Sequence, residues 1–86
     1  MFEVILSPEA LAFYTDADRI LAGKLARCFA QLESEPRRHA NVKRLKGELA
    51  GLSRYRVGDW RVVYRMVESE RCVFVLLIAH RRDVYE

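Results

Sequence analysis

Apolar residues recur at strand-like spacing in four stretches of the chain. In the first stretch, Phe2–Ser7, alternation places Phe2, Val4 and Leu6 on one face. Three further stretches lie in the second half of the sequence, at about Leu52–Val57, Trp60–Val67 and Cys72–Ala79. The pattern predicts one strand near the N-terminus and three consecutive strands toward the C-terminus.

Helical signals replace this alternation after the first strand. Ser7 fits an N-cap, Pro8 the first helical position and Glu9 the first turn, which predicts a short helix carrying Leu11 and Tyr14. A second helix is predicted from about residue 18 to residue 34. Its apolar side chains fall at steps of four, three and four residues and form one stripe: Leu21, Leu25, Cys28 and Leu32.

The segment between the helices and the last three strands is a basic connector. Residues 37–51 read RRHANVKRLKGELAG, and we expect about one helical turn there, with Val42 and Leu45 packed on the body. Gly58-Asp59 predicts a two-residue hairpin turn, and ESER joins the last two strands.

The element order is therefore β-α-α-β-β-β. It predicts an α+β fold in which two helices pack on one face of a small antiparallel sheet, and residues 1–86 form a single domain.

Charge is distributed unevenly along the chain. The formal net charge is +3, yet residues 36–65 hold nine basic and two acidic side chains. Residues 1–35 hold three and six, and residues 66–86 hold three and four. A strongly basic third indicates a polyanionic partner. The plainer alternative is a solvated charged surface.

Other features narrow the class of protein. The start, MFEVIL, lacks the basic region of a signal peptide, and the longest apolar run spans eight residues, where a membrane helix needs about 20. We therefore expect a cytoplasmic protein. Cys28 and Cys72 lack CxxC spacing, and His39 and His80 form no metal-binding pattern, so no cofactor or metal is expected.

The predicted hairpin has one apolar and one basic face. If Gly58-Asp59 is the whole loop, alternation gives one face Tyr55, Val57, Trp60, Val62 and Tyr64, and the other Arg54, Arg56, Arg61, Val63 and Arg65. Arg56 and Arg61 are then direct cross-strand neighbours, an arrangement that opposes folding by roughly 0.2–1 kcal/mol. Because arginine binds phosphate through two parallel hydrogen bonds, the cluster suggests an anion site.

The register of the last strand follows from a tight ESER turn. Val67 then pairs with Cys72 and Arg61 with Ile78, which brings residues 80–82 to the Gly58-Asp59 end of the sheet. In this register three apolar residues share the arginine face: Phe74, Leu76 and Ile78. We expect a loop or a partner to cover such a strip.

Three segments together resemble one known family. The SPEA helix start, RLKGELAGLSRYRVGDWRVVYR and VFVLLIAHRRDVY are similar to the RelE/ParE superfamily of bacterial toxins. The resemblance implies the same fold, a cognate antitoxin protein encoded alongside, and operator DNA bound by the toxin-antitoxin complex through the antitoxin. RelE-like members cut messenger RNA on the ribosome, whereas ParE-like members inhibit DNA gyrase.

The resemblance also implies catalytic positions. Those of RelE-like members fall here on Arg54, Arg56, Arg61, Arg81 with His80 before it, and Tyr85. Arginines stand where the best-known relative has lysines. The match favours a ribosome-dependent endoribonuclease that works without metal, by attack of a 2′-hydroxyl on the phosphodiester. A gyrase inhibitor and an inactive nucleic-acid-binding member are the alternatives.

Each candidate residue has an expected role. The strand arginines would stabilise the phosphorane charge, and Arg81 would contact phosphate or the leaving group. Proton transfer stays open between His80 and Tyr85; a strand-end residue and a packing anchor are their plainer readings. The expected contacts to RNA or ribosome backbone are Lys43, Arg44, Lys46 and Arg65.

Overall fold

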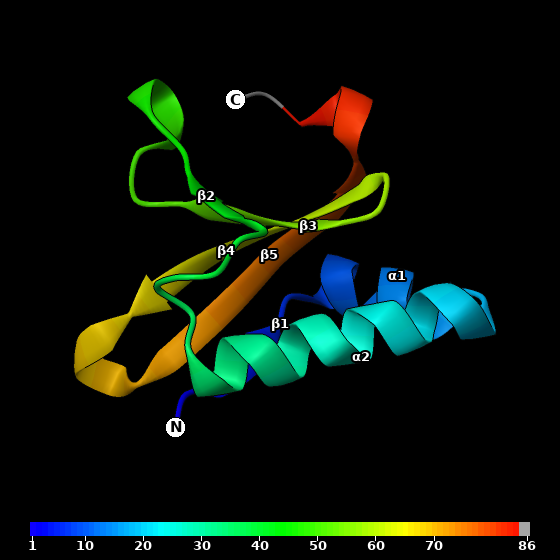
Figure 1. Ribbon diagram of the computed structural model, residues 1–86, viewed down its shortest axis with the longest axis horizontal. Coiled ribbons are helices and arrows are strands. Elements are labelled where there is room, and N and C mark those ends of the chain that lie inside the picture. The colour runs from blue at the N-terminus through cyan, green and yellow to red at the C-terminus, as the bar shows by residue number, and fades with distance from the viewer. Residues whose placement is uncertain (85–86) are drawn as a thin grey trace.

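The computed structural model, which describes residues 1–84, has one five-stranded sheet with its two helices on the same face (Figure 1). The strands lie in the order β1-β5-β4-β3-β2. Short 3-10 turns η1 and η3 lie on the face away from the helices. The elements are β1 (Glu3–Leu6), α1 (Pro8–Asp16), α2 (Arg19–Ser34), β2 (Val42–Arg44), η1 (Gly47–Leu49), β3 (Ser53–Val57), β4 (Trp60–Val67), η2 (Glu68–Glu70), β5 (Cys72–His80) and η3 (Arg81–Asp83).

The predicted four strands and two helices are confirmed, and the structure adds two features. β1 pairs with β5 in parallel, so the sheet is mixed, while the other pairings are antiparallel. The connector holds a fifth strand, β2, besides the expected helical turn, η1. Three residues are too few to show an alternating pattern, and β2 exists because its backbone pairs with β3.

Both helices begin at a capping side chain, which is the predicted Ser7 for α1 and Asp18 for α2. The Ser7 hydroxyl accepts a hydrogen bond from the Ala10 amide at 3.0 Å, and the Asp18 carboxylate accepts one from the Leu21 amide at 2.8 Å. The Ser7 hydroxyl also donates to the Leu76 carbonyl at 2.9 Å, which ties the start of α1 to β5. Neither helix within residues 1–84 is long and apolar enough to span a bilayer.

The core lies between the sheet and the helices. The predicted stripe of α2 faces it, with Leu25, Cys28 and Leu32 buried. Tyr64 is buried at the centre of the sheet and donates a 2.7 Å hydrogen bond to the Pro36 carbonyl, just after α2. Burial raises the pKa of Tyr64 to about 12, so its hydroxyl keeps the proton that this bond needs.

Tyr64→Phe should lower the free energy of unfolding by about 1–2 kcal/mol, because the Pro36 carbonyl loses its buried donor. Urea unfolding at pH 7 measures this effect. Tyr14→Phe is the matched control, since the Tyr14 ring packs edge-on against Phe29 and its hydroxyl forms no hydrogen bond within residues 1–84. Equal stability of Tyr64→Phe and the wild type would mean that the bond contributes nothing.

Candidate functional site

The β3–β4 hairpin has the register predicted from its turn. Val57 pairs with Trp60 and Arg56 with Arg61 across the Gly58-Asp59 loop. Gly58 has a φ of +59°, a conformation that glycine adopts without strain and that two-residue hairpin loops require. The hairpin therefore carries two unlike faces, as expected.

The apolar face packs on the helices. Its buried members are Tyr55, Val57, Val62 and Tyr64. Trp60 is half-buried and lies against Phe13 of α1, with 4.9 Å between ring centroids. Burial raises the pKa of the Tyr55 hydroxyl, so that group stays neutral at physiological pH.

The opposite face carries the arginines, together with a lysine that sequence reasoning placed in a connector. Because Lys43 of β2 pairs with Arg54 of β3, the two side chains share this face with Arg56 and Arg61. We call Lys43, Arg54, Arg56 and Arg61 the arginine face. The sequence does not place Lys43 in this cluster because it does not predict β2, and only the pairing of β2 with β3 brings Lys43 beside Arg54.

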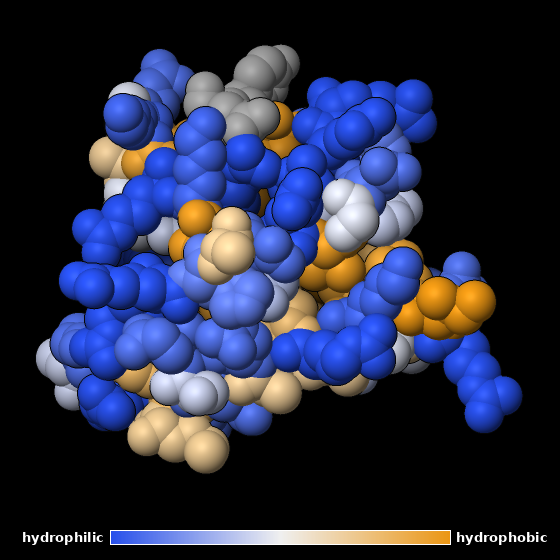
Figure 2. All heavy atoms as spheres, in the orientation of Figure 1, coloured by the Kyte–Doolittle hydropathy of each residue, from blue (hydrophilic) through white to orange (hydrophobic). Residues whose placement is uncertain are grey.

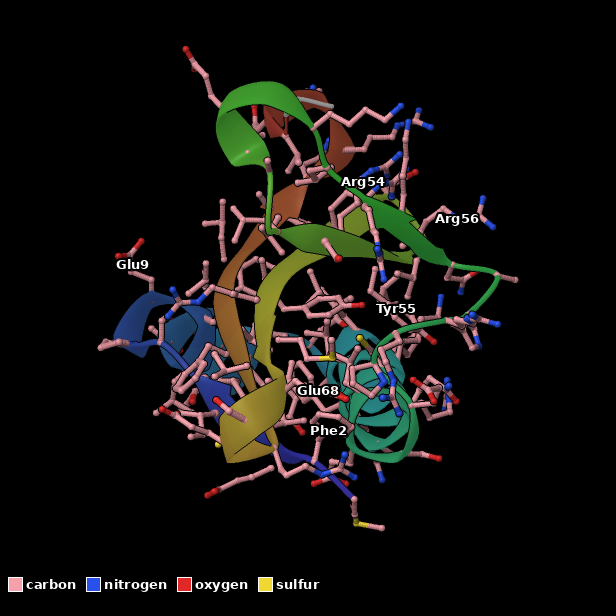
Figure 3. The ribbon with its side chains drawn as sticks, turned by 90° about the vertical axis from the view of Figure 1, so that its left-hand side faces the viewer. Phe2, Glu9, Arg54, Tyr55, Arg56 and Glu68 are labelled. Carbon is pink, nitrogen blue, oxygen red and sulfur yellow. The ribbon has the colours of Figure 1, made fainter. Side chains whose placement is uncertain are left out.

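The three arginines of this face are held differently. The Arg61 guanidinium is fixed over the turn, where Nη1 donates to the carbonyls of Gly58 at 2.9 Å and Trp60 at 3.0 Å. Arg54 is half-buried. Arg56 is exposed and points outward from the edge of β3, whereas Tyr55 between them turns toward α2 (Figure 3). The site therefore combines an anchored guanidinium with an exposed one, whose Nη2 donates to Asn41 Oδ1 at 3.5 Å.

A β-bulge corrects the predicted register of the last strand. Val67 pairs with Cys72 as expected, but Val63 pairs with Leu77 and Tyr64 with Val75, so Leu76 is an extra residue. One extra residue moves everything beyond it to the opposite face. Arg61 thus lies opposite Ala79, and the prediction that it pairs with Ile78 is wrong.

The apolar strip beside the arginine face changes accordingly. Ile78 is 5% exposed and belongs to the core, so its predicted place in the strip is wrong. Leu76 and Leu77 are 37% and 40% exposed. With η1, η3 and their flanking residues they form an apolar groove of about 250 Å³, lined by Leu45, Leu49, Leu52, Val63, Leu76, Leu77, Asp83 and Val84. A loop therefore covers the strip in part.

The C-terminal residues reach the hairpin turn as predicted. The Arg81 amide donates to the Asp59 carbonyl at 2.8 Å, and the Nε atom of the Arg81 side chain lies 3.8 Å from the Asp59 carboxylate.

The His80 ring lies on the helix side of the sheet. It packs edge-on against Trp60, with 5.4 Å between ring centroids, and its Nδ1 accepts a hydrogen bond from the Arg82 amide at 3.3 Å. The structure therefore brings Arg81 to the turn, whereas the His80 ring lies on the opposite side from the arginine face.

The remaining candidates are spread more widely. Arg65 lies four residues along β4 from Arg61, roughly 13 Å away, and its guanidinium sits 5.8 Å from the centre of the Phe74 ring. Arg44 follows Lys43 in β2 and lies on the other face of the sheet. Lys46 is exposed just before η1. Tyr85 lies outside the described residues.

Comparisons with known proteins agree with this fold and hairpin. A family model described as the ParE toxin of a type II toxin-antitoxin system matches residues 4–85. Toxin RelG of Mycobacterium tuberculosis is 39% identical over 67 residues, which make up 78% of this chain and 75% of that protein. The chain belongs to the RelE/ParE superfamily of type II toxins.

Solved structures of other toxins share the architecture. The toxin resembles a chain of the RelBE2 toxin-antitoxin complex from Mycobacterium tuberculosis, with a TM-score of 0.78 and 32% identity over 93% of this chain and 98% of that one. It also resembles a chain of the archaeal RelE-RelB complex from Pyrococcus horikoshii, with a TM-score of 0.82 over 96% and 98%. At 22% identity, the second likeness concerns the fold alone.

Arg56→Gln should raise the free energy of unfolding by about 0.2–1 kcal/mol at low salt, because the toxin loses a like charge directly opposite Arg61. The gain should shrink in 0.5 M salt as the repulsion is screened. Urea unfolding at both salt concentrations measures it, and Arg38→Gln controls for net charge from an exposed loop position. A loss of stability in Arg56→Gln would show that the arginine pair does not oppose folding.

Proposed function

We propose that this toxin is a ribosome-dependent endoribonuclease that cleaves messenger RNA in the cytoplasm. The observation that carries the proposal is the arginine face, where Arg56 lies directly opposite Arg61 across the hairpin and Arg54 lies beside them. Arg81 arrives at the same end of the sheet through its contacts with Asp59. Several arginine side chains close together repel one another, and a ligand with several phosphates would neutralise them.

The reaction is an attack of the RNA 2′-hydroxyl on the adjacent phosphorus, without metal. A bond forms between that oxygen and phosphorus, the bond to the 5′-oxygen breaks, and a cyclic phosphate and a free 5′-hydroxyl result. Negative charge builds up on the phosphorane oxygens, and groups already in place stabilise it best. Arg61 suits this role because two backbone carbonyls hold its guanidinium in position, with Arg54 and Arg56 beside it and Arg81 near the leaving oxygen.

Two proton transfers accompany the attack. The base takes the 2′-hydroxyl proton and the acid supplies one to the 5′-oxygen; we propose Tyr85 or His80 as the residue that transfers these protons. Because the His80 ring lies on the helix side of the sheet, it would serve only RNA that passes around the Gly58-Asp59 end. The contact from the Arg82 amide occupies Nδ1 of His80, so Nε2 is the nitrogen left to act.

Further cations would hold the toxin on the ribosome. Lys43 belongs to the arginine face. Arg65 lies farther along β4, Lys46 lies just before η1, and Arg44 lies on the other face of β2. Their contacts to phosphates would be sequence-independent and weakened by salt.

Inhibition of DNA gyrase is the second candidate. It is favoured by the family model, whose description names a ParE toxin. Such a toxin acts by binding a protein rather than by cutting RNA, and the arginine face would then serve only as a contact surface.

Expression in bacteria should arrest growth and leave messenger RNA with new 5′-hydroxyl ends, only in transcripts that are being translated. Mapping RNA ends before and after induction, with and without a block of translation initiation, measures this. Intact messages together with DNA damage and altered supercoiling would exclude the endoribonuclease and support the gyrase inhibitor.

Variants connect this outcome to the site. Arg61→Ala and Arg81→Ala should each abolish toxicity with the fold retained, because each removes a cation at the hairpin end; circular dichroism and urea unfolding check the fold. Arg71→Ala, at the opposite end of the β4–β5 hairpin, should stay toxic. A fully toxic Arg61→Ala variant would remove Arg61 from the mechanism.

A cognate antitoxin is the expected partner, since the solved relatives include toxin-antitoxin complexes. We propose that it covers the apolar groove and the neighbouring arginine face, and that the complex binds operator DNA through the antitoxin. Hydrogen exchange should then show added protection in residues 45–52 and 76–77 when the antitoxin is bound, but not along the solvent side of α2. Equal exchange of residues 45–52 and 76–77 with and without antitoxin would place the contact elsewhere.

A further inference from the structure

A second basic site lies on the other side of the hairpin edge, in a cleft between α2 and β3. Its volume is about 370 Å³, and three of its lining side chains are cations: Lys24, Arg27 and Arg56. The polar groups of Asn41 and Tyr55 also line it, and the described lining includes no acidic residue. Hydrophilic side chains cover much of the molecular face that α2 and the segment after it present (Figure 2).

Lys24 and Arg27 come from one face of α2. Residues three apart are neighbours on a helix, so these two like charges oppose each other. Neither forms an ion pair with any residue of the described part of the chain. An anion in the cleft would relieve the repulsion between these two charges.

The adjoining hollow has a different character. It shares Lys24, Val57 and Gly58 with the cleft, but its lining includes two carboxylates, Asp18 and Asp59. Negative charge there disfavours a polyanion. The anion-binding part of the groove is therefore the end that holds Arg27 and Asn41.

Arg56 links the cleft to the arginine face. β2 begins at Val42, which pairs with Tyr55, so the strand does not extend alongside Arg56. The Arg56 amide donates to the Asn41 carbonyl at 2.9 Å. At this edge the long Arg56 side chain points outward (Figure 3), its Nη2 donates to Asn41 Oδ1 at 3.5 Å, and both residues are among those that line the cleft. One strand of phosphates could therefore contact both basic surfaces around Arg56.

An aromatic stack adjoins the same edge. The exposed ring of His39 lies parallel to the Tyr55 ring, with 5.1 Å between centroids and 22° between planes. A basic groove beside an exposed stacking ring is the combination that single-stranded nucleic acids bind, with phosphates in the groove and a base on the ring.

We propose that this cleft is a second RNA-binding site, which holds backbone phosphates on Lys24 and Arg27 while the strand passes around the sheet edge at Arg56. The choice of RNA as the ligand rests on the proposed function. The arrangement of charges in the cleft is independent of that function. The site anchors the strand and takes no part in cleavage.

Binding of a fluorescent 12-nucleotide RNA with 2′-O-methyl riboses, which cannot be cleaved by 2′-hydroxyl attack, tests the proposal. Anisotropy titrations of the full chain from about 50 to 300 mM salt give affinity and salt dependence. Lys24→Gln/Arg27→Gln should weaken binding roughly tenfold or more at 0.1 M salt. The negative slope of log K against log salt should also become shallower by about 1.4, which is 0.7 for each of the two lost phosphate contacts. Arg19→Gln/Arg71→Gln removes equal charge away from the cleft and should keep the wild-type slope.

Three outcomes would overturn the cleft proposal: equal binding by the two double variants, an effect of Lys24→Gln/Arg27→Gln on duplex DNA alone, or an effect on antitoxin binding alone. A cleavage assay in a translating extract separates the two proposals. If the wild type cuts messages and both double variants bind RNA alike, only the cleft proposal fails. If the wild type cuts nothing but Lys24→Gln/Arg27→Gln loses RNA affinity, the cleft proposal stands and the endoribonuclease fails.

Discussion

The single-residue bulge at Leu76 determines which residues of β5 lie on each face of the sheet. Before it, Val73 and Val75 face the core; after it, Ile78 does, although alternation alone would send Ile78 outward. Ser7 holds this irregularity from the neighbouring strand, since its amide donates to the Val75 carbonyl at 2.8 Å and its hydroxyl to the Leu76 carbonyl. The Ser7 side chain therefore caps α1 and also gives the Leu76 carbonyl a hydrogen-bond partner at the bulge, where the regular pairing of β4 with β5 is interrupted. Without the bulge, His80 would not lie beside Trp60.

Charge repulsion is the second constraint on the molecule. Arg56 and Arg61 face each other on the sheet, and Lys24 and Arg27 on the helix, in a domain too small to offset such costs with a large core. Arg61 recovers part of this by donating to two turn carbonyls. Arg56 is exposed at the edge between the two basic surfaces, where its one side-chain hydrogen bond within residues 1–84 goes to Asn41.

Local interactions explain what the sequence could predict. The caps at Ser7 and Asp18, the stripe of α2 and the two faces of the hairpin depend on neighbours within a few residues, and all are found in the structure. β2, the parallel pairing of β1 with β5, and the bulge depend on contacts between distant segments, which no short pattern records.

The same distinction applies to the candidate site. The Arg56–Arg61 pair could be read from a two-residue turn, whereas the cleft of Lys24 and Arg27 exists only because α2 packs under β3. Lys24 and Arg27 are ordinary surface positions of a helix until that packing brings Arg56 beside them.

The parallel pairing of β1 with β5 joins the two ends of the chain. Glu3 lies opposite Cys72, and the fully buried Val73 and Val75 belong to the last strand along the chain. The central sheet therefore cannot close until nearly the whole chain has been synthesised, and its ends must meet across some seventy residues, a slow step for a small domain. β5 also flanks β4, so the hairpin that carries the arginine face gains its second neighbouring strand only when this last strand is in place.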